Sequence, residues 1–280
     1  MAAEQKVWFI TGVSRGFGKV LTEHALANND IVIGTTRDGK AAFAGDARNL
    51  QLLPLEVTDA AAIRATIAKA HSLHGRLDVV VNNAGYGLLG AVEEATEEQV
   101  DHLFEVNFHG TRRVVQAVLP FLRKQRSGHI INITSIAGLA PGAGSGFYAA
   151  SKFAVEGFTQ SLAIEVAPLG IKVTLVEPGA FRTDFLSDRS IRDAAVEIPD
   201  YAPTAGAVRA ALAKMAGKQS GDPLKGVAAI FQITREPKPP LHLVLGSDAL
   251  RRTRDQQAQL AADMQRFEAV ALGTDYPKGA

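Results

Sequence analysis

The sequence predicts an α/β protein whose core is one doubly wound parallel sheet of about seven strands, with helices on both faces. Three observations support this fold class. Short apolar runs rich in β-branched residues alternate along the chain with amphipathic helical patterns. The first apolar run passes directly into a glycine-rich turn, and several later runs end in small or polar residues. The sequence contains no repeat, linker or low-complexity segment, so we expect residues 1–280 to form a single domain.

The composition excludes several classes of protein. Thirty basic residues balance 29 acidic ones, which gives a net charge of +1, and no basic run is long enough to follow a phosphate backbone. We therefore expect no nucleic-acid partner. The absence of cysteine excludes disulfides, thiolate nucleophiles and cysteine-based zinc sites. No window reaches the roughly 20 apolar residues of a membrane span, so we expect a cytoplasmic protein.

The first predicted strand, Lys6–Ile10, leads into the turn Thr11–Gly18 and then into a helix that runs to about Asn28. The three glycines of this turn permit positive φ and a close approach of a ligand to the backbone. The N-terminus of the helix presents unpaired N–H groups and the positive end of the helix dipole. A tight connection alone would also explain the turn, but its place between a strand and a helix favours a pyrophosphate site.

The end of the second predicted strand, Ile31–Thr35, distinguishes NAD from NADP, because in a dinucleotide-binding fold it lies beside the adenosine ribose. An NAD site would place Asp or Glu there, whereas this chain has two threonines followed by Arg37. A guanidinium binds a 2′-phosphate that a carboxylate would repel. Arg15 adds a second positive group, and Asp38 is a competing partner for Arg37. We expect NADP(H) in preference to NAD(H).

The remaining elements follow from the same patterns. Further strands are expected at Leu50–Val57, Leu77–Asn82, His129–Thr134, Lys172–Val176 and Leu241–Leu245, and helices at 59–74, 96–125, 146–167, from 222 onward and at 248–272. Residues 182–204 show no clear hydrophobic period, which indicates a flap. We therefore expect a substrate lid over residues 181–215, and a C-terminal helical extension over residues 247–272. His71 and His74 lack a third ligand nearby, so we expect a solvated pair and no metal site.

A possible catalytic grouping lies between residues 134 and 158. Tyr148 and Lys152 are four residues apart, which places them on one face of a helix. A free phenol titrates near pH 10, and a neighbouring ammonium favours its ionised form. Ser135, at the end of a β-branched run, is placed to donate a hydrogen bond to the same substrate oxygen as Tyr148. A Tyr-x-x-x-Lys spacing is common by chance on amphipathic helices, so this interpretation depends on a dinucleotide site nearby.

Asn107 lies inside the helix predicted for residues 96–125. Asn is mildly unfavourable in the middle of a helix unless its side chain makes a specific contact. We weigh two interpretations equally: a local kink with a water-linked polar role, and a side chain that faces solvent.

Several motifs occur together in one order and spacing: Thr11-Gly12-x-x-x-Gly16-x-Gly18, Asn82-Asn83-Ala84-Gly85, Asn107, Ser135, Tyr148-x-x-x-Lys152 and Pro178-Gly179. In these motifs the chain resembles the short-chain dehydrogenase/reductase family, which has a Rossmann-type fold. The resemblance covers about Lys6 to Leu245.

The resemblance implies a role for each matching residue. Tyr148 would be the general acid/base; Lys152 would lower its pKa and hold the nicotinamide ribose; Ser135 would orient the substrate oxygen; and Asn107 would hold a water of a proton relay. The cofactor-binding residues implied are Gly12, Ser14, Arg15, Gly16, Phe17, Gly18, Arg37, Glu56, Val57, Asn83, Ala84, Gly85, Tyr148, Lys152, Pro178, Gly179 and Thr183. The family usually has Asp where Glu56 stands, so its contact with the adenine is expected to shift or disappear.

The function implied is an NADP(H)-dependent oxidoreductase that interconverts a ketone or aldehyde and an alcohol by hydride transfer, on an apolar small molecule. Two alternatives remain at this point: a non-catalytic nucleotide-sensing binding protein on the same fold, and a lyase or isomerase of a related family. The helices at 96–125 and 146–167 are apolar over more than one face, and the resemblance implies that they pair in a homodimer or homotetramer.

Overall fold

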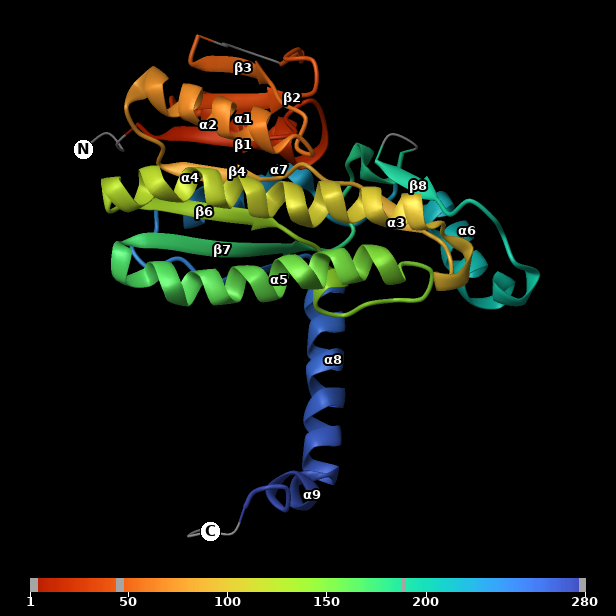
Figure 1. Cartoon of the computed structure of the whole chain (residues 1–280). Coiled ribbons are helices and arrows are strands. Elements are labelled where there is room, and N and C mark those ends of the chain that lie inside the picture. Colours follow the sequence, from red (N-terminus) through yellow and green to blue (C-terminus); the bar gives the residue numbers. More distant parts are fainter. Residues whose placement is uncertain (1–4, 44–47, 188–189, 277–280) are drawn as a thin grey trace.

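Seven parallel strands form the central sheet, in the order β3-β2-β1-β4-β6-β7-β9 (Figure 1). The computed structural model describes residues 5–43, 48–187 and 190–276. The strands are β1 (Val7–Thr11), β2 (Ile31–Thr36), β3 (Leu50–Pro54), β4 (Val79–Asn82), β6 (Gly128–Ile133), β7 (Ile171–Pro178) and β9 (His242–Leu245). Every neighbouring pair in this sheet is parallel. The predicted doubly wound sheet is confirmed.

Helices cover both faces of the sheet. On one face α2 (Ala60–His74), α4 (Thr111–Gln125) and α5 (Gly146–Val166) enclose one apolar cluster, and on the other face α1 (Gly16–Ala27) and α7 (Pro223–Ile233) enclose a second. The strands between them are buried on both sides, which explains why β1 and β4 are almost uniformly apolar. Outside these layers lie α3 (Glu97–Phe104), α6 (Ala207–Met215), α8 (Ser247–Arg266) and α9 (Glu268–Leu272).

Local sequence signals explain where two of these helices begin. The Asp59 carboxylate accepts hydrogen bonds from the backbone N–H groups of Ala61 and Ala62, at 2.8 and 2.9 Å, and so caps α2. Thr96 and Gln99 form the reciprocal capping box of α3. Both caps satisfy N–H groups that the first turn of a helix leaves unpaired.

Five features differ from the expected elements. The third strand ends at Pro54 rather than Val57, and the chain turns at Val57 and Thr58, just before the Asp59 cap. The helix expected at 96–125 contains a π-helical segment, Glu105–Gly110. The C-terminal helix breaks at Phe267, which separates α8 from α9. A small parallel pair, β5 (Gly87–Leu89) with β8 (Ile191–Asp193), and helix α6 were not expected.

Two smaller findings concern metals and membranes. His71, expected to be solvated, instead stacks its ring on Phe121 with centroids 4.4 Å apart. Within residues 5–43, 48–187 and 190–276, no helix combines the length and the apolar character needed to span a bilayer.

We expect Ile67→Ala to lower the free energy of unfolding by about 2–5 kcal/mol, because Ile67 is fully buried between α2 and the sheet and its removal leaves a cavity. Urea denaturation measures the change. Leu73→Ala is the matched control on the same helix; Leu73 is 39% exposed, so its loss should change the value by about 0.5 kcal/mol or less. Equal effects of the two substitutions would contradict the layer packing described here.

Candidate active site

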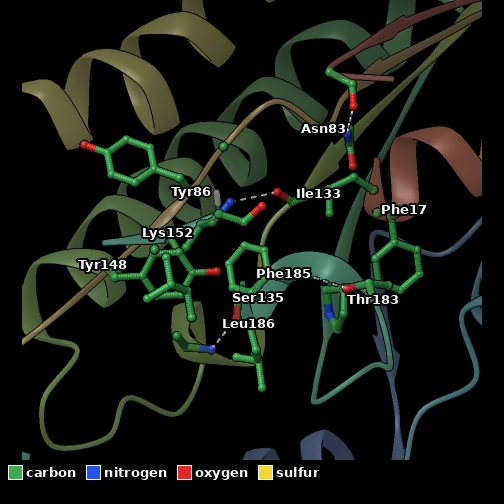
Figure 2. A pocket seen from close by; sticks show the side chains of 18 of the residues that line it. Phe17, Asn83, Tyr86, Ile133, Ser135, Tyr148, Lys152, Thr183, Phe185 and Leu186 are labelled. Atoms are coloured by element: carbon green, nitrogen blue, oxygen red, sulfur yellow. Dashed lines mark hydrogen bonds between the residues drawn. The ribbon is translucent and has the colours of Figure 1, made fainter. Parts of the chain in front are cut away.

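A cavity of about 1160 Å³ opens at the carboxyl edge of the sheet, where loops from β1, β2, β4, β6 and β7 meet (Figure 2). Most residues singled out from the sequence line it. They are Gly12, Ser14, Arg15, Gly16, Phe17, Arg37, Glu56, Val57, Asn83, Ala84, Gly85, Ser135, Tyr148, Lys152, Pro178, Gly179 and Thr183. The two predicted site residues outside the lining are Gly18 and Asn107.

The glycine turn after β1 leaves room for a ligand at the start of α1. Gly12 and Gly16 have φ of +72° and +57°, which few residues other than glycine adopt. A Cβ on Gly16 would meet no atom within 4 Å, so this side of the turn is open. Arg15 occupies the N-cap position in extended backbone and makes no side-chain cap. The first N–H groups of α1 are therefore available to an anion.

Gly18 is required by packing and not by contact with the cavity. A Cβ at this position would lie 2.4 Å from both the Asn83 Nδ2 atom and the Gly12 carbonyl oxygen. The same Asn83 amide donates hydrogen bonds to the carbonyl oxygens of Thr11 and Gly12, at 3.0 and 2.9 Å. In return, the Thr11 hydroxyl accepts from the N–H groups of Asn83 and Ala84. Together these bonds lock the end of β4 against the end of β1.

Positive side chains stand at the end of β2. Arg37 lines the cavity, and so does Lys40, which the sequence analysis missed. The Asp38 carboxylate accepts hydrogen bonds from the Thr36 hydroxyl and the Lys40 N–H, both at 3.1 Å, and these bonds hold its pKa below the usual value. The two hydrogen bonds therefore fix the orientation of the Asp38 carboxylate within its own turn. In the glycine turn, Arg15 donates from Nε to the Ser190 hydroxyl at 2.8 Å.

Ser135, Tyr148 and Lys152 converge on the other half of the cavity, and Figure 2 shows the three side chains grouped there. Tyr148 and Lys152 come from α5, with the Lys152 Nζ atom 5.8 Å from the centre of the Tyr148 ring. That ammonium donates to the Ile133 carbonyl oxygen at 3.0 Å. Ser135 follows β6, and its hydroxyl oxygen accepts from the Ala137 N–H. The grouping expected from the sequence is therefore formed in three dimensions.

Burial sets the protonation of this group. It raises the pKa of Tyr148 to about 12, and a hydrogen bond with Ser135 offsets only part of the rise. Burial also lowers the pKa of Lys152 to about 8, against the attraction of Glu156. The lowered tyrosine pKa expected from the sequence is not found in the protein alone, because desolvation of the phenolate dominates. At neutral pH the phenol keeps its proton and the lysine is mostly charged.

Asn107 lies behind the site in the π-helical segment, and it is 1% exposed. Its Oδ1 accepts from the Tyr86 N–H at 3.0 Å, and its Nδ2 donates to the Tyr86 carbonyl oxygen and the Ser151 hydroxyl. A Cβ at Gly85 would lie 3.1 Å from that Oδ1 and 3.6 Å from the Lys152 Nζ atom. Of the two interpretations weighed above, the solvent-facing one is wrong; the side chain braces the loop after β4.

The structure adds cavity residues that carried no signal in the sequence. The Asp248 carboxylate, at the start of α8, accepts from the Ala180 N–H at 2.9 Å. It also occupies the space beside Gly179, where a Cβ would lie 2.3 Å from its oxygen. On the opposite wall, the Arg192 guanidinium lies 4.7 Å from the centre of the Tyr86 ring. These contacts join segments that lie far apart in the chain, so no local sequence pattern predicts them.

A polar cluster lies next to the site, between α5 and the last two strands. The Thr134 hydroxyl contacts Glu156 Oε1 at 2.6 Å, and His242 Nδ1 contacts Glu177 Oε1 at 2.6 Å. Both carboxyl groups are buried, and burial raises the pKa of Glu156 to about 7 and of Glu177 to about 8. At neutral pH Glu177 therefore keeps most of its proton, whereas Glu156 is only partly protonated.

The parallel sheet, the open glycine turn and the Ser–Tyr–Lys grouping at one edge define an oxidoreductase of the α/β class. The chain belongs to the short-chain dehydrogenase family, whose model matches residues 6–193. The family resemblance and the enzymatic nature expected from the sequence are thereby confirmed, and the binding-protein alternative is set aside.

Three known proteins illustrate the similarity. The 3-ketodihydrosphingosine reductase of Bacteroides thetaiotaomicron is 39% identical over 244 residues, which cover 87% of this chain and 88% of that protein. The crystal structure of a short-chain dehydrogenase from Streptomyces avermitilis is 40% identical, with a TM-score of 0.91, and covers 98% of this chain and 100% of that one. A structure of ElxO with NADP bound is 27% identical, with a TM-score of 0.73, and covers 89% and 100%.

We expect Glu177→Gln to gain stability relative to the wild type as the pH rises from 5 to 8.5. In the unfolded chain the Glu177 carboxyl ionises near its usual pKa of about 4.5, whereas in the folded protein its pKa is about 8. Between these values only the unfolded chain releases the proton, so a rising pH destabilises the wild type, and Gln removes this effect.

Urea denaturation at pH 5.5, 7 and 8.5 provides the measurement. Glu165→Gln, at an exposed position of α5, is the control for the loss of a surface carboxylate. A stability difference for Glu177→Gln that does not rise with pH beyond that of the control would show that the buried carboxyl does not hold its proton.

Proposed function

We propose that this enzyme is an NADP(H)-dependent carbonyl reductase that interconverts a ketone or aldehyde and an alcohol. The observation that carries the proposal is the convergence of the Ser135 hydroxyl, the Tyr148 phenol and the Lys152 ammonium on one side of the cavity, with an anion-binding turn on the other. A carbonyl oxygen between the two hydroxyl groups would meet two hydrogen-bond donors.

The residues present fit a dinucleotide. The open space beside Gly16 and the uncapped start of α1 suit its pyrophosphate, and Ser14 lies in the same turn. We assign three further groups of cavity-lining residues to the rest of the dinucleotide: Glu56 and Val57 to the adenine, Asn83 to Gly85 to the adenosine side, and Thr183 with Pro178 and Gly179 to the carboxamide. When bound, the nicotinamide would supply the hydride of the reaction.

Charge at the end of β2 supports NADP(H) over NAD(H). The strand ends in buried Thr36, where an NAD site would have a carboxylate, and Arg37 and Lys40 line the cavity just beyond it. Two cations in this place attract a 2′-phosphate. The related ElxO structure has NADP bound, which also supports NADP(H) as the cofactor.

The protonation found here suits reduction. Because the pKa of Tyr148 is about 12, its hydroxyl is a proton donor at neutral pH and gives its proton to the substrate oxygen as that oxygen becomes an alkoxide. Ser135 donates a hydrogen bond to the same oxygen. The Lys152 ammonium, anchored on the Ile133 carbonyl oxygen, stabilises the phenolate that remains. Asn107 holds the backbone of Tyr86, and the neighbouring Gly85 lies beside this ammonium.

An apolar substrate fits the outer wall of the cavity. Phe185 and Leu186 line it together with Val208, Leu212 and Met215 of α6. We propose residues 181–215 as the lid that covers the substrate; residues 188 and 189 of this segment lie outside the described residues. The name of the Bacteroides relative, a reductase of 3-ketodihydrosphingosine, accords with an apolar ketone. We also propose that the chain is one domain with residues 247–272 as an extension.

We expect Tyr148→Phe to lower kcat for carbonyl reduction by about 100-fold or more, because it removes the proton donor and keeps the ring. Consumption of NADPH, followed by its absorbance with a panel of apolar ketones and aldehydes, measures turnover. Fluorescence titration of NADPH is the control and should give an unchanged Kd. Turnover near that of the wild type would refute the role given to Tyr148.

We expect Arg37→Ala to weaken NADPH binding by about 10- to 100-fold, the range that corresponds to losing one hydrogen bond to a charged group. The KM for NADH should change little, because NADH has no 2′-phosphate. Arg64→Ala, which replaces an exposed arginine of α2 outside the cavity, is the matched control. Equal losses for NADPH and NADH would argue against a phosphate-binding role.

A further inference from the structure

The last helices of the chain stand away from the rest of the protein. Figure 1 shows α8 projecting from the body and carrying α9 at its far end. We call residues 254–276 the C-terminal arm, and every one of them is exposed. Twenty residues of α8 span about 30 Å, so the arm reaches well beyond the body. An isolated helix of this length is only marginally stable in water, since most helical stability in proteins comes from packing.

The root of the arm is fixed firmly to the body. Ala249 is fully buried in a small cluster with Ile136 and Ala140, and Arg252 donates a hydrogen bond to the Ala140 carbonyl oxygen. Asp248 accepts from the Ala180 N–H beside the cavity. Thr253 is also buried. These contacts fix the direction in which α8 leaves the body. The arm therefore projects away from its own subunit and does not pack against it.

An apolar stripe runs along the arm. Ala249 and Thr253, which pack on the body, lie on the same face of α8 as Leu260 and Met264 farther along, and Phe267 follows at the C-cap of the helix. Gln256 and Gln257 separate the two apolar groups on this face. Beyond the root this face covers nothing: Leu260, Met264 and Phe267 are 57, 60 and 51% exposed. Val270 and Leu272 of α9 are also exposed, at 64 and 68%. Large apolar side chains left exposed together on one face of a helix indicate an interaction surface.

The charges of the arm distinguish between partners. Within residues 251–255, near the root, Arg251, Arg252 and Arg254 stand against one aspartate, whereas the outer part carries Asp263, Glu268 and Asp275 against one arginine. An acidic tip disfavours an anionic lipid surface, to which basic amphipathic helices bind. A second copy of the same arm, running in the opposite direction, would place each acidic tip beside a basic root while burying both stripes.

We infer that the C-terminal arm is a self-association element in which the arms of two copies pair antiparallel along the stripe Leu260, Met264 and Phe267. The inference is independent of the catalytic proposal, since it uses only the exposure, spacing and charge of the arm. It assigns the oligomer contact to a surface other than the faces of α4 and α5 considered from the sequence.

The first experiment compares two double variants of the full chain by analytical ultracentrifugation. Met264→Glu with Phe267→Glu places two charges on the stripe, and we expect the mass in solution to fall by half. Ala258→Glu with Gln265→Glu adds the same charge on the opposite face of α8, because successive residues of a helix are about 100° apart, and should keep the wild-type mass. Circular dichroism and thermal unfolding verify that the body of each variant is folded.

Several outcomes would overturn the inference. One is a wild-type chain that is monomeric at tens of micromolar; another is a stripe variant that keeps the wild-type mass, which would move the contact to another face, such as that of α5 with its exposed Phe153 and Ile164. Co-sedimentation of the wild type with phosphatidylcholine vesicles, abolished in the stripe variant, would identify a lipid surface as the occupant instead.

A charge exchange tests the antiparallel direction. Arg254→Glu and Asp275→Arg should each weaken self-association, and the two together should restore it, because pairing centred on Met264 brings the root of one copy beside the tip of the other. Losses that add in the double variant would rule out this pairing.

Discussion

The locking of β4 against β1 by Asn83 is the interaction on which the site depends. Its side-chain amide binds the carbonyl oxygens of Thr11 and Gly12, and the Thr11 hydroxyl binds the N–H groups that follow β4. These hydrogen bonds fix the glycine turn at one end of the cavity relative to the loop at Gly85, which lies beside Lys152. Gly18 must lack a side chain because Asn83 fills that space, so this glycine of the motif serves packing.

Burial governs the chemistry on the other half. Tyr148, Lys152, Glu156 and Glu177 are all nearly or fully buried at or beside the carboxyl edge of the sheet, and the pKa of each moves toward its neutral form. For the tyrosine this keeps the phenol protonated at neutral pH. For Glu156, whose charge acts on Lys152, it reduces the negative charge beside the ammonium.

Helix α8 links the site to the exposed end of the chain. Its first turn supplies Asp248, which holds the loop after β7 and occupies the space beside Gly179. One turn later Arg252 contacts the loop after β6 through the Ala140 carbonyl oxygen. The helix that bears the apolar stripe therefore also forms part of the cavity wall.

The sequence by itself determined the sheet, most of its strands and the set of residues at its edge. Apolar strands buried on both faces and a glycine turn of fixed length are local patterns, and the parallel topology brings their ends to one edge. The tertiary structure decided what depends on distant neighbours. It turned Asn107 inward through a π-helical segment, placed Asp248 beside Gly179, and raised the pKa of Tyr148 through burial. It also left the arm uncovered. Each of these outcomes depends on which residues come together in space and on the desolvation that follows. The spacing of residues along the chain shows only which side chains share a face of a helix or strand.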